Sequence, residues 1–68
     1  MKIRYFADTD TLYVELNDNP VVETREINEN SLIDLDASGN LVALTLEHAR
    51  GVTDLSEFSL YQVVTQTT

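Results

Sequence analysis

The sequence predicts an α+β fold: an antiparallel β-meander of about five strands, with one short C-terminal helix packed on one face and a possible extra C-terminal strand. Three observations lead to this prediction. Apolar and polar residues alternate in short runs between Ile3 and His48, turn-forming clusters separate the runs, and the pattern changes after Gly51. Because alternation with a period of two places every second side chain on the same face, we expect a sheet with one buried face.

The first two runs, residues 2–6 and 11–17, predict a hairpin closed by a turn at residues 7–10. Tyr13 and Glu15 face away from the core in this arrangement. The inward-facing residues of the two strands are Ile3, Tyr5, Leu12, Val14 and Leu16.

The next two runs differ in regularity. Residues 21–27 carry charges on both faces, which is typical of an edge strand because charged side chains discourage pairing with stray chains. Pro20, just before this run, is compatible with the start of a strand. Residues 31–36 alternate more regularly and place Ile33 and Leu35 inward.

Residues 41–48 have the longest and most regular alternation, with Val42, Leu44 and Leu46 on one face. We expect this strand at the centre of the sheet. The turn that precedes it contains Gly39, which can adopt the positive φ of a tight turn.

The segment that follows favours a short helix. Asp54 and Glu57 have the spacing of a helix cap followed by an acidic residue three positions later. Val52, Leu55 and Phe58 recur every three residues and would lie across the apolar face of the sheet.

The last residues are rich in β-branched side chains, which disfavour a helix. For residues 60–64 we therefore rank an added strand above an extension of the helix, and we expect residues 65–68 to fray. Because the chain has no internal repeat and no linker, residues 1–68 are predicted to form a single domain.

A chain of 68 residues is small for a stable core, since it buries only about 60% of the surface of its unfolded chain. It has no Cys and a single His, so self-association as a homodimer is favoured over disulfides or a metal as the source of extra stability. The lack of Cys also favours a cytoplasmic location. No stretch has the length of a membrane span.

Twelve carboxylates against four Lys and Arg residues give a formal net charge of −8. This charge repels phosphate backbones and anionic lipids, so we expect neither direct nucleic-acid binding nor membrane binding. A basic protein is the partner that such a charge attracts. The simpler interpretation is that the charge only keeps a small domain soluble.

Exposed aromatic residues among carboxylates are typical of protein interfaces. Phe6 and the outward Tyr13 are the aromatic candidates, although cross-strand packing of the two would explain them equally well. The predicted partner-binding residues are Phe6, Tyr13, Glu15, Glu23, Glu26 and Glu29.

The alternative interpretation is a small metal-binding protein or enzyme that uses the Asp34 and Asp36 hairpin with His48. The segment that begins at Asp34 matches the opening of a calcium loop, but the twelfth position is Thr45 instead of a bidentate Glu. His48 has no nucleophile in a recognisable motif. In the simpler interpretation, the side chains of Asp36 and Asn40 satisfy turn amides of the hairpin, and the protein has no cofactor and no catalytic residues.

Three ordered segments resemble a family of small uncharacterised bacterial proteins, domain of unknown function 2283. They are residues 5–13, 22–27 and 33–42, and the resemblance ends near Ala49. The resemblance implies a fold and no established catalytic residue. It also implies binding to a small toxin-like protein, because some members are thought to be encoded beside such proteins as candidate antitoxins. We therefore interpret the chain as a non-enzymatic protein-binding module. More specifically, we expect this chain to be the antitoxin-like partner of a small basic protein.

Overall fold

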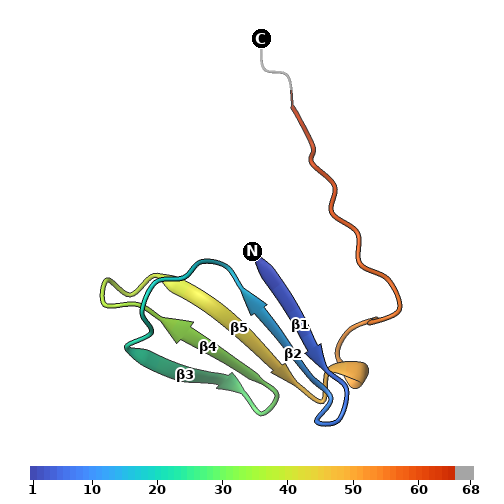
Figure 1. Ribbon diagram of the computed structural model, residues 1–68, viewed down its shortest axis with the longest axis horizontal. Helices are drawn as coiled ribbons and strands as arrows, with labels where there is room; N and C mark the ends of the chain where they lie inside the picture. Colours follow the sequence, from blue (N-terminus) through green and yellow to red (C-terminus); the bar gives the residue numbers. More distant parts are fainter. Residues whose placement is uncertain (66–68) are drawn as a thin grey trace.

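The computed structural model describes residues 1–65, which form one five-stranded antiparallel sheet (Figure 1). The elements are β1 (Lys2–Phe6), β2 (Thr11–Glu15), β3 (Glu23–Asn28), β4 (Ser31–Leu35), β5 (Leu41–Glu47) and a single 3-10 turn, η1 (Ala49–Gly51). The five predicted strands are thus confirmed, and no strand end differs from the predicted one by more than two residues.

The strand order is β1-β2-β5-β4-β3. The predicted central position of β5 and the predicted edge position of β3 are confirmed. The predicted meander is wrong, because β2 pairs with β5 and the chain between β2 and β3 crosses the end of the sheet. Strands β2 to β5 therefore form a Greek key.

Two side-chain amides fix this crossing. Asn17 donates from Nδ2 to the carbonyl of Leu41 at 3.1 Å, and Asn19 donates from Nδ2 to Oδ2 of Asp36 at 3.1 Å. These bonds hold the connection against the β4–β5 turn. As a result β5, the most apolar strand, is inserted between β2 and β4, where both of its edges are paired.

The strand register separates the side chains into an apolar face and a polar face. One row across the sheet joins Ile3, Val14, Leu44 and Ile33, and the next joins Tyr5, Leu12, Leu46 and Ser31. These rows define the apolar face and confirm the inward positions predicted for these apolar residues. The polar face includes Lys2, Arg4, Phe6, Tyr13, Glu15, Glu26, Leu32, Asp34 and Thr45.

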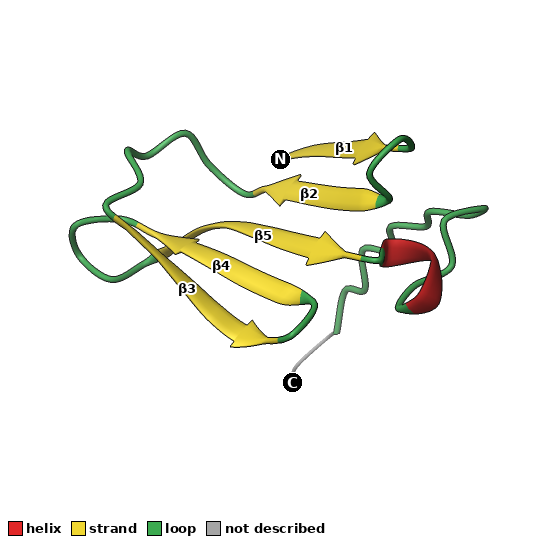
Figure 2. Ribbon diagram, turned by 90° about the horizontal axis from the view of Figure 1, so that it is seen from below, coloured by secondary structure: helices red, strands yellow, loops and turns green. Residues whose placement is uncertain are grey.

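The core is thin because the sheet is a single twisted layer (Figure 2). The buried apolar residues are Leu35, Val42, Ala43 and Ala49. Val42 and Ala43 are neighbours in β5, so their side chains point to opposite faces of the sheet. Because both are buried, water is excluded from both faces of this strand. Most other residues of the apolar face are only half-buried or exposed, since a single layer has no second layer to cover it.

The predicted C-terminal helix is wrong, and so is the extra C-terminal strand: residues 52–65 form neither element. The fold is therefore all-β. Asp54 explains part of this result, because its Oδ1 accepts hydrogen bonds from the amide (2.9 Å) and hydroxyl (2.6 Å) of Ser56. This local turn competes with a helix cap. A helix of one or two turns is also too short to be stable without packing.

No helix in residues 1–65 is long and apolar enough to cross a membrane. The fraying that we expect for the end of the chain falls mainly on residues 66–68, which lie outside the described residues.

Candidate functional site

Four of the six predicted contact residues share the polar face. Arg4, Tyr13, Thr45, Leu32 and Glu26 form one continuous row across the sheet. The neighbouring row joins Lys2, Glu15, Ala43, Asp34 and Thr24. Phe6 lies at the end of β1 on the same face as Arg4, and its side chain is exposed. The strand register thus brings Phe6, Tyr13, Glu15 and Glu26 onto one surface.

The other two predicted residues lie elsewhere. Glu23 is opposite Leu35 in the register, on the apolar side of the edge strand, where its Oε2 is 2.8 Å from a terminal nitrogen of Arg25. Glu29 lies in the turn between β3 and β4. The carboxylate of Glu23 is therefore engaged by a cation, whereas Glu29 extends the acidic surface around the end of the sheet.

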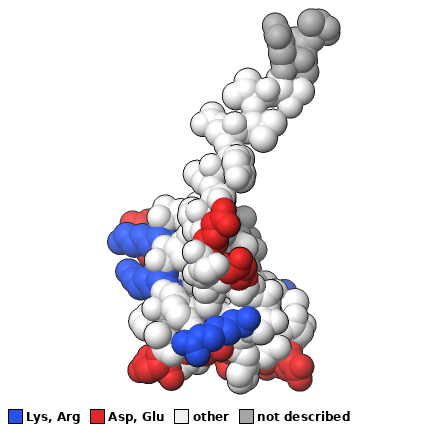
Figure 3. All heavy atoms as spheres, turned by 90° about the vertical axis from the view of Figure 1, so that its right-hand side faces the viewer, with Lys and Arg blue, Asp and Glu red and all other residues white. Residues whose placement is uncertain are grey.

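Charge is unevenly distributed along the chain. Residues 17–40, which contain β3 and β4, hold one arginine and six carboxylates: Asp18, Glu23, Glu26, Glu29, Asp34 and Asp36. The opposite edge of the polar face carries Lys2 and Arg4 on β1. Figure 3 views the molecule from the right-hand side of Figure 1 and shows basic side chains on this end, with carboxylates beside them. The polar face is thus basic at β1 and acidic towards β3.

The acidic edge of the sheet is open. β3 pairs only with β4, and all six of its residues are exposed. The register shifts between Glu26 and Asn28, which is a bulge of the kind that interrupts pairing at sheet edges. An open edge with unpaired backbone groups can accept a partner strand.

The hairpin that the alternative interpretation assigns to a metal is a hydrogen-bonded turn. Oδ1 of Asp36 accepts the amides of Ser38 and Asn40, each at 2.9 Å. The amide of Asn40 is the main reason why the pKa of Asp36 is lowered from its usual value. Gly39 has the predicted positive φ, at 82°. Asp36 therefore has the role of turn acceptor.

The remaining metal candidates are also separate from one another. Asp34 accepts the hydroxyl of Thr24 at 2.7 Å, and Nδ1 of His48 lies 2.9 Å from Oδ1 of Asn30. Within residues 1–65, no three His, Asp or Glu side chains are grouped as a metal site would require. The geometry of these residues therefore gives no support to a metal site at the Asp34 and Asp36 hairpin.

A cluster around Asp10 was missed by the sequence analysis. The Tyr5 hydroxyl donates to Oδ1 of Asp10 at 2.7 Å, and the amide of Arg50 donates to the same oxygen at 3.1 Å. The Arg50 guanidinium lies 5.9 Å from the centre of the Tyr5 ring, within the range of a cation–π contact. The Tyr5 bond is the main cause of a lowered pKa of Asp10, and it raises the pKa of Tyr5.

This cluster has a structural function. Asp10 has a φ of 53°, and its carbonyl accepts the amide of Ala49 at 2.9 Å. It therefore joins the first hairpin to η1 and sets the point at which the C-terminal segment leaves the sheet. The only local sequence signal was the Asp itself, because Asp is one of the few residues that tolerate a positive φ in a turn.

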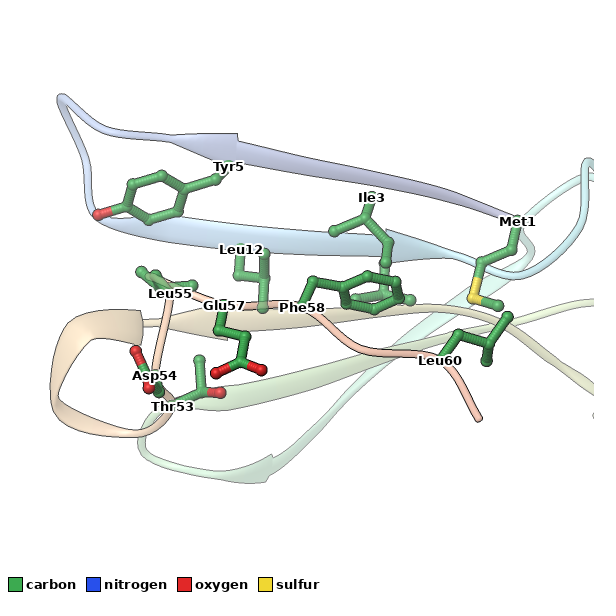
Figure 4. A pocket seen from close by; sticks show the side chains of 11 residues that line it. Met1, Ile3, Tyr5, Leu12, Thr53, Asp54, Leu55, Glu57, Phe58 and Leu60 are labelled. Atoms are coloured by element: carbon green, nitrogen blue, oxygen red, sulfur yellow. The ribbon is translucent and has the colours of Figure 1, made fainter. Parts of the chain in front are cut away.

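An apolar groove of about 770 Å³ lies between the apolar face of β1 and β2 and the segment after η1 (Figure 4). Its sheet wall consists of Met1, Ile3, Tyr5, Leu12 and Val14. Its second wall consists of Thr53, Asp54, Leu55, Glu57, Phe58 and Leu60. Leu55 is half-buried there, whereas Phe58 and Leu60 are mostly exposed, so the segment fills the groove only in part.

One family model matches the chain. It is described as "Protein of unknown function (DUF2283)" and covers residues 2–50, from β1 to the 3-10 turn. No curated protein and no solved structure matches the sequence. The groove-lining segment after η1 lies outside the matched residues.

Proposed function

We propose that this chain, which belongs to the DUF2283 family of proteins of unknown function, is a non-enzymatic module that binds a basic protein through its polar face. One observation carries the proposal: the strand register places Tyr13 in the same row as Glu26, with Glu15 and Asp34 in the adjacent row. Tyr13 has Arg4 and Thr45 as its direct cross-strand partners and Glu15 two residues along the same strand, whereas Glu26 and Asp34 lie farther along this face. An aromatic side chain that shares a face with carboxylates matches the chemistry of a contact with Lys and Arg.

The electrostatic field favours such a partner. With a net charge of −8, the chain attracts basic proteins over distances comparable to the Debye length of about 8 Å at physiological salt. Attraction is strongest at the β3 side, where Glu26 and Glu29 are exposed and the cations of β1 are farthest away. We therefore expect the partner to approach over β3 and β4.

The specific form that we propose is an antitoxin-like role, in which this protein neutralises a small basic partner in the cytoplasm. Family resemblance and charge support this form. Binding of a basic protein at an acidic surface masks its positive charge, which would prevent the partner from reaching a polyanionic target.

The proposal can be tested by capture from a lysate of the native host, followed by calorimetry with the purified basic protein that is captured. The test variant is Glu26→Lys with Glu29→Lys. The matched control is Asp8→Lys with Glu57→Lys, which changes the net charge equally but lies outside β3 and β4.

We expect the wild type and the control to capture one basic protein, and the Glu26 and Glu29 variant to bind it at least tenfold more weakly. Because the contacts are electrostatic, the affinity should also fall as salt is added. Equal binding by all three proteins, or capture of no basic protein, would contradict the proposal.

A further inference from the structure

The part of the chain that the structure describes ends in an exposed apolar arm, which we define as residues 58–65. The exposed fractions of Phe58, Leu60 and Val64 are 70%, 77% and 82%. Tyr61 and Val63 are exposed to a similar degree. Burying these side chains against another surface would be favourable, because it removes apolar area from water. A contiguous exposed apolar patch of this kind marks an interaction site.

Only the first part of the arm lies near its own sheet. Phe58 and Leu60 still line the groove above β1 and β2, but beyond Leu60 the chain runs away from the strands (Figure 1). The segment that leads to the arm starts from a fixed point, because η1 is hydrogen-bonded to Asp10. The geometry therefore leaves two apolar surfaces apart from each other in one copy, the groove and the outer half of the arm.

The chain exposes more surface than a compact monomer of its size, and contact with a second copy would cover most of the excess. A compact monomer of 7.7 kDa is expected to expose about 4,300 Å², whereas this chain exposes 5409 Å². The excess is about 1,100 Å², and a standard interface buries about 800 Å² on each partner. An interface of standard size with one additional copy would therefore cover most of this excess.

Charge favours a second copy over a basic protein at this surface. The arm has no charged residue, and neither do the side chains of the sheet wall of the groove. The carboxylates of the other wall, Asp54 and Glu57, accept hydrogen bonds from Ser56 and Ser59 of the same segment. Contact between an arm and the sheet wall of the other copy therefore brings no two charged side chains together.

We propose that two copies exchange arms, with Phe58, Leu60 and the following arm residues of each copy packed against the apolar face of the other. A twofold axis makes the two contacts identical and closes the assembly as a dimer. Because this contact uses the apolar face, it leaves the polar face of both copies free, and it does not depend on the proposed binding of a basic protein.

The direct test is disulfide trapping. Because the sequence has no Cys, only the introduced cysteines can form a disulfide. Ile3→Cys on the sheet wall and Leu60→Cys in the arm are prepared as separate proteins, mixed and oxidised. We expect a mixed disulfide between the two proteins, identified by mass. Lys2→Cys is the matched control for Ile3→Cys, because it lies one residue away on the polar face, and we expect it to form little mixed disulfide with Leu60→Cys.

Sedimentation equilibrium supplies a second test, with Phe58→Asp and, as control, Ser59→Asp. Both add one charge to the arm, but only Phe58 lines the groove. We expect Phe58→Asp to weaken dimerisation at least tenfold and Ser59→Asp to leave it nearly unchanged.

A monomeric wild type, a dimer that Phe58→Asp does not weaken, or equal trapping of Ile3→Cys and Lys2→Cys would overturn the proposal. If Phe58→Asp unfolds as a monomer, the trapping experiment still decides, because it substitutes only exposed positions.

Discussion

The hydroxyl of Tyr5 donates a hydrogen bond of 2.7 Å to Oδ1 of Asp10, at the opposite end of the first turn. The same oxygen accepts the amide of Arg50, from a segment that is 40 residues away in the sequence. One carboxylate therefore connects the first hairpin to η1, from which the C-terminal segment starts.

Asp10→Ala should release this connection. We expect a lower melting temperature and faster hydrogen exchange of the Arg50 amide, because that amide loses its acceptor. Asp8→Ala is the control, since Asp8 accepts only the amide of the adjacent Thr9 among the observed bonds. Equal effects of the two substitutions would show that the carboxylate of Asp10 has no special function.

Stability should fall at acidic pH. The Tyr5 hydroxyl lowers the pKa of Asp10, and the Asn40 amide lowers the pKa of Asp36. Because both values lie below those of the unfolded chain, the unfolded state takes up protons first as the pH falls. The stability from these groups is complete above the unfolded pKa of about 3.9, and it is lost as the pH falls through the folded-state pKa values.

The measurement is the melting temperature between about pH 6 and pH 2 for the wild type and Asp36→Asn. We expect a smaller acid-induced decrease for Asp36→Asn, because this group no longer titrates. Asp18→Asn, which removes a carboxylate from the neighbouring loop, should retain the decrease of the wild type. The same pH profile for wild type and Asp36→Asn would be inconsistent with the turn described here.

The two glycines should respond differently to alanine. Gly39 has a φ of +82°, which an L-residue adopts at a cost of about 1–2 kcal/mol. Gly51 has no positive φ and no neighbour within 4 Å of an added Cβ. Chemical denaturation should show that Gly39→Ala is destabilised by this amount, whereas Gly51→Ala is neutral or stabilised by up to about 1 kcal/mol. A neutral Gly39→Ala would contradict the turn geometry.

The thin core should depend strongly on Leu35. Its exposed fraction is 8%, so truncation to alanine should cost about 2–5 kcal/mol of unfolding free energy. Leu41 is opposite Leu35 in the register but is 40% exposed, and Leu41→Ala should cost about 1 kcal/mol or less. Similar losses for the two variants would indicate that the core lies elsewhere.

Local periodicity was sufficient to predict the strands and their faces. Leu12, Val14, Leu44 and Leu46 point the same way because side chains alternate along any strand, whatever the topology. The same alternation identified β5 as central and β3 as an edge. It could not give the strand order, because the crossing after β2 depends on bonds from Asn17 and Asn19 to residues far along the chain.

The helix prediction failed for a different reason. Asp54 and Glu57 have the spacing of a cap, but a cap signal does not supply the packing that a short helix needs. Ser56, two residues after Asp54, offered a competing local bond. The polar-face residues were predicted better: Phe6, Tyr13, Glu15 and Glu26 share a surface because alternation applies to both faces, whereas Glu23 falls on the other side of β3.

The central claim is that the polar face binds a basic protein, and NMR mapping of the amide signals during titration with the captured partner tests it most directly. The account predicts that the largest changes occur at Tyr13, Glu26 and Asp34 and decrease as salt is added. Changes confined to Ile3, Leu44 and their neighbours on the apolar face would contradict it.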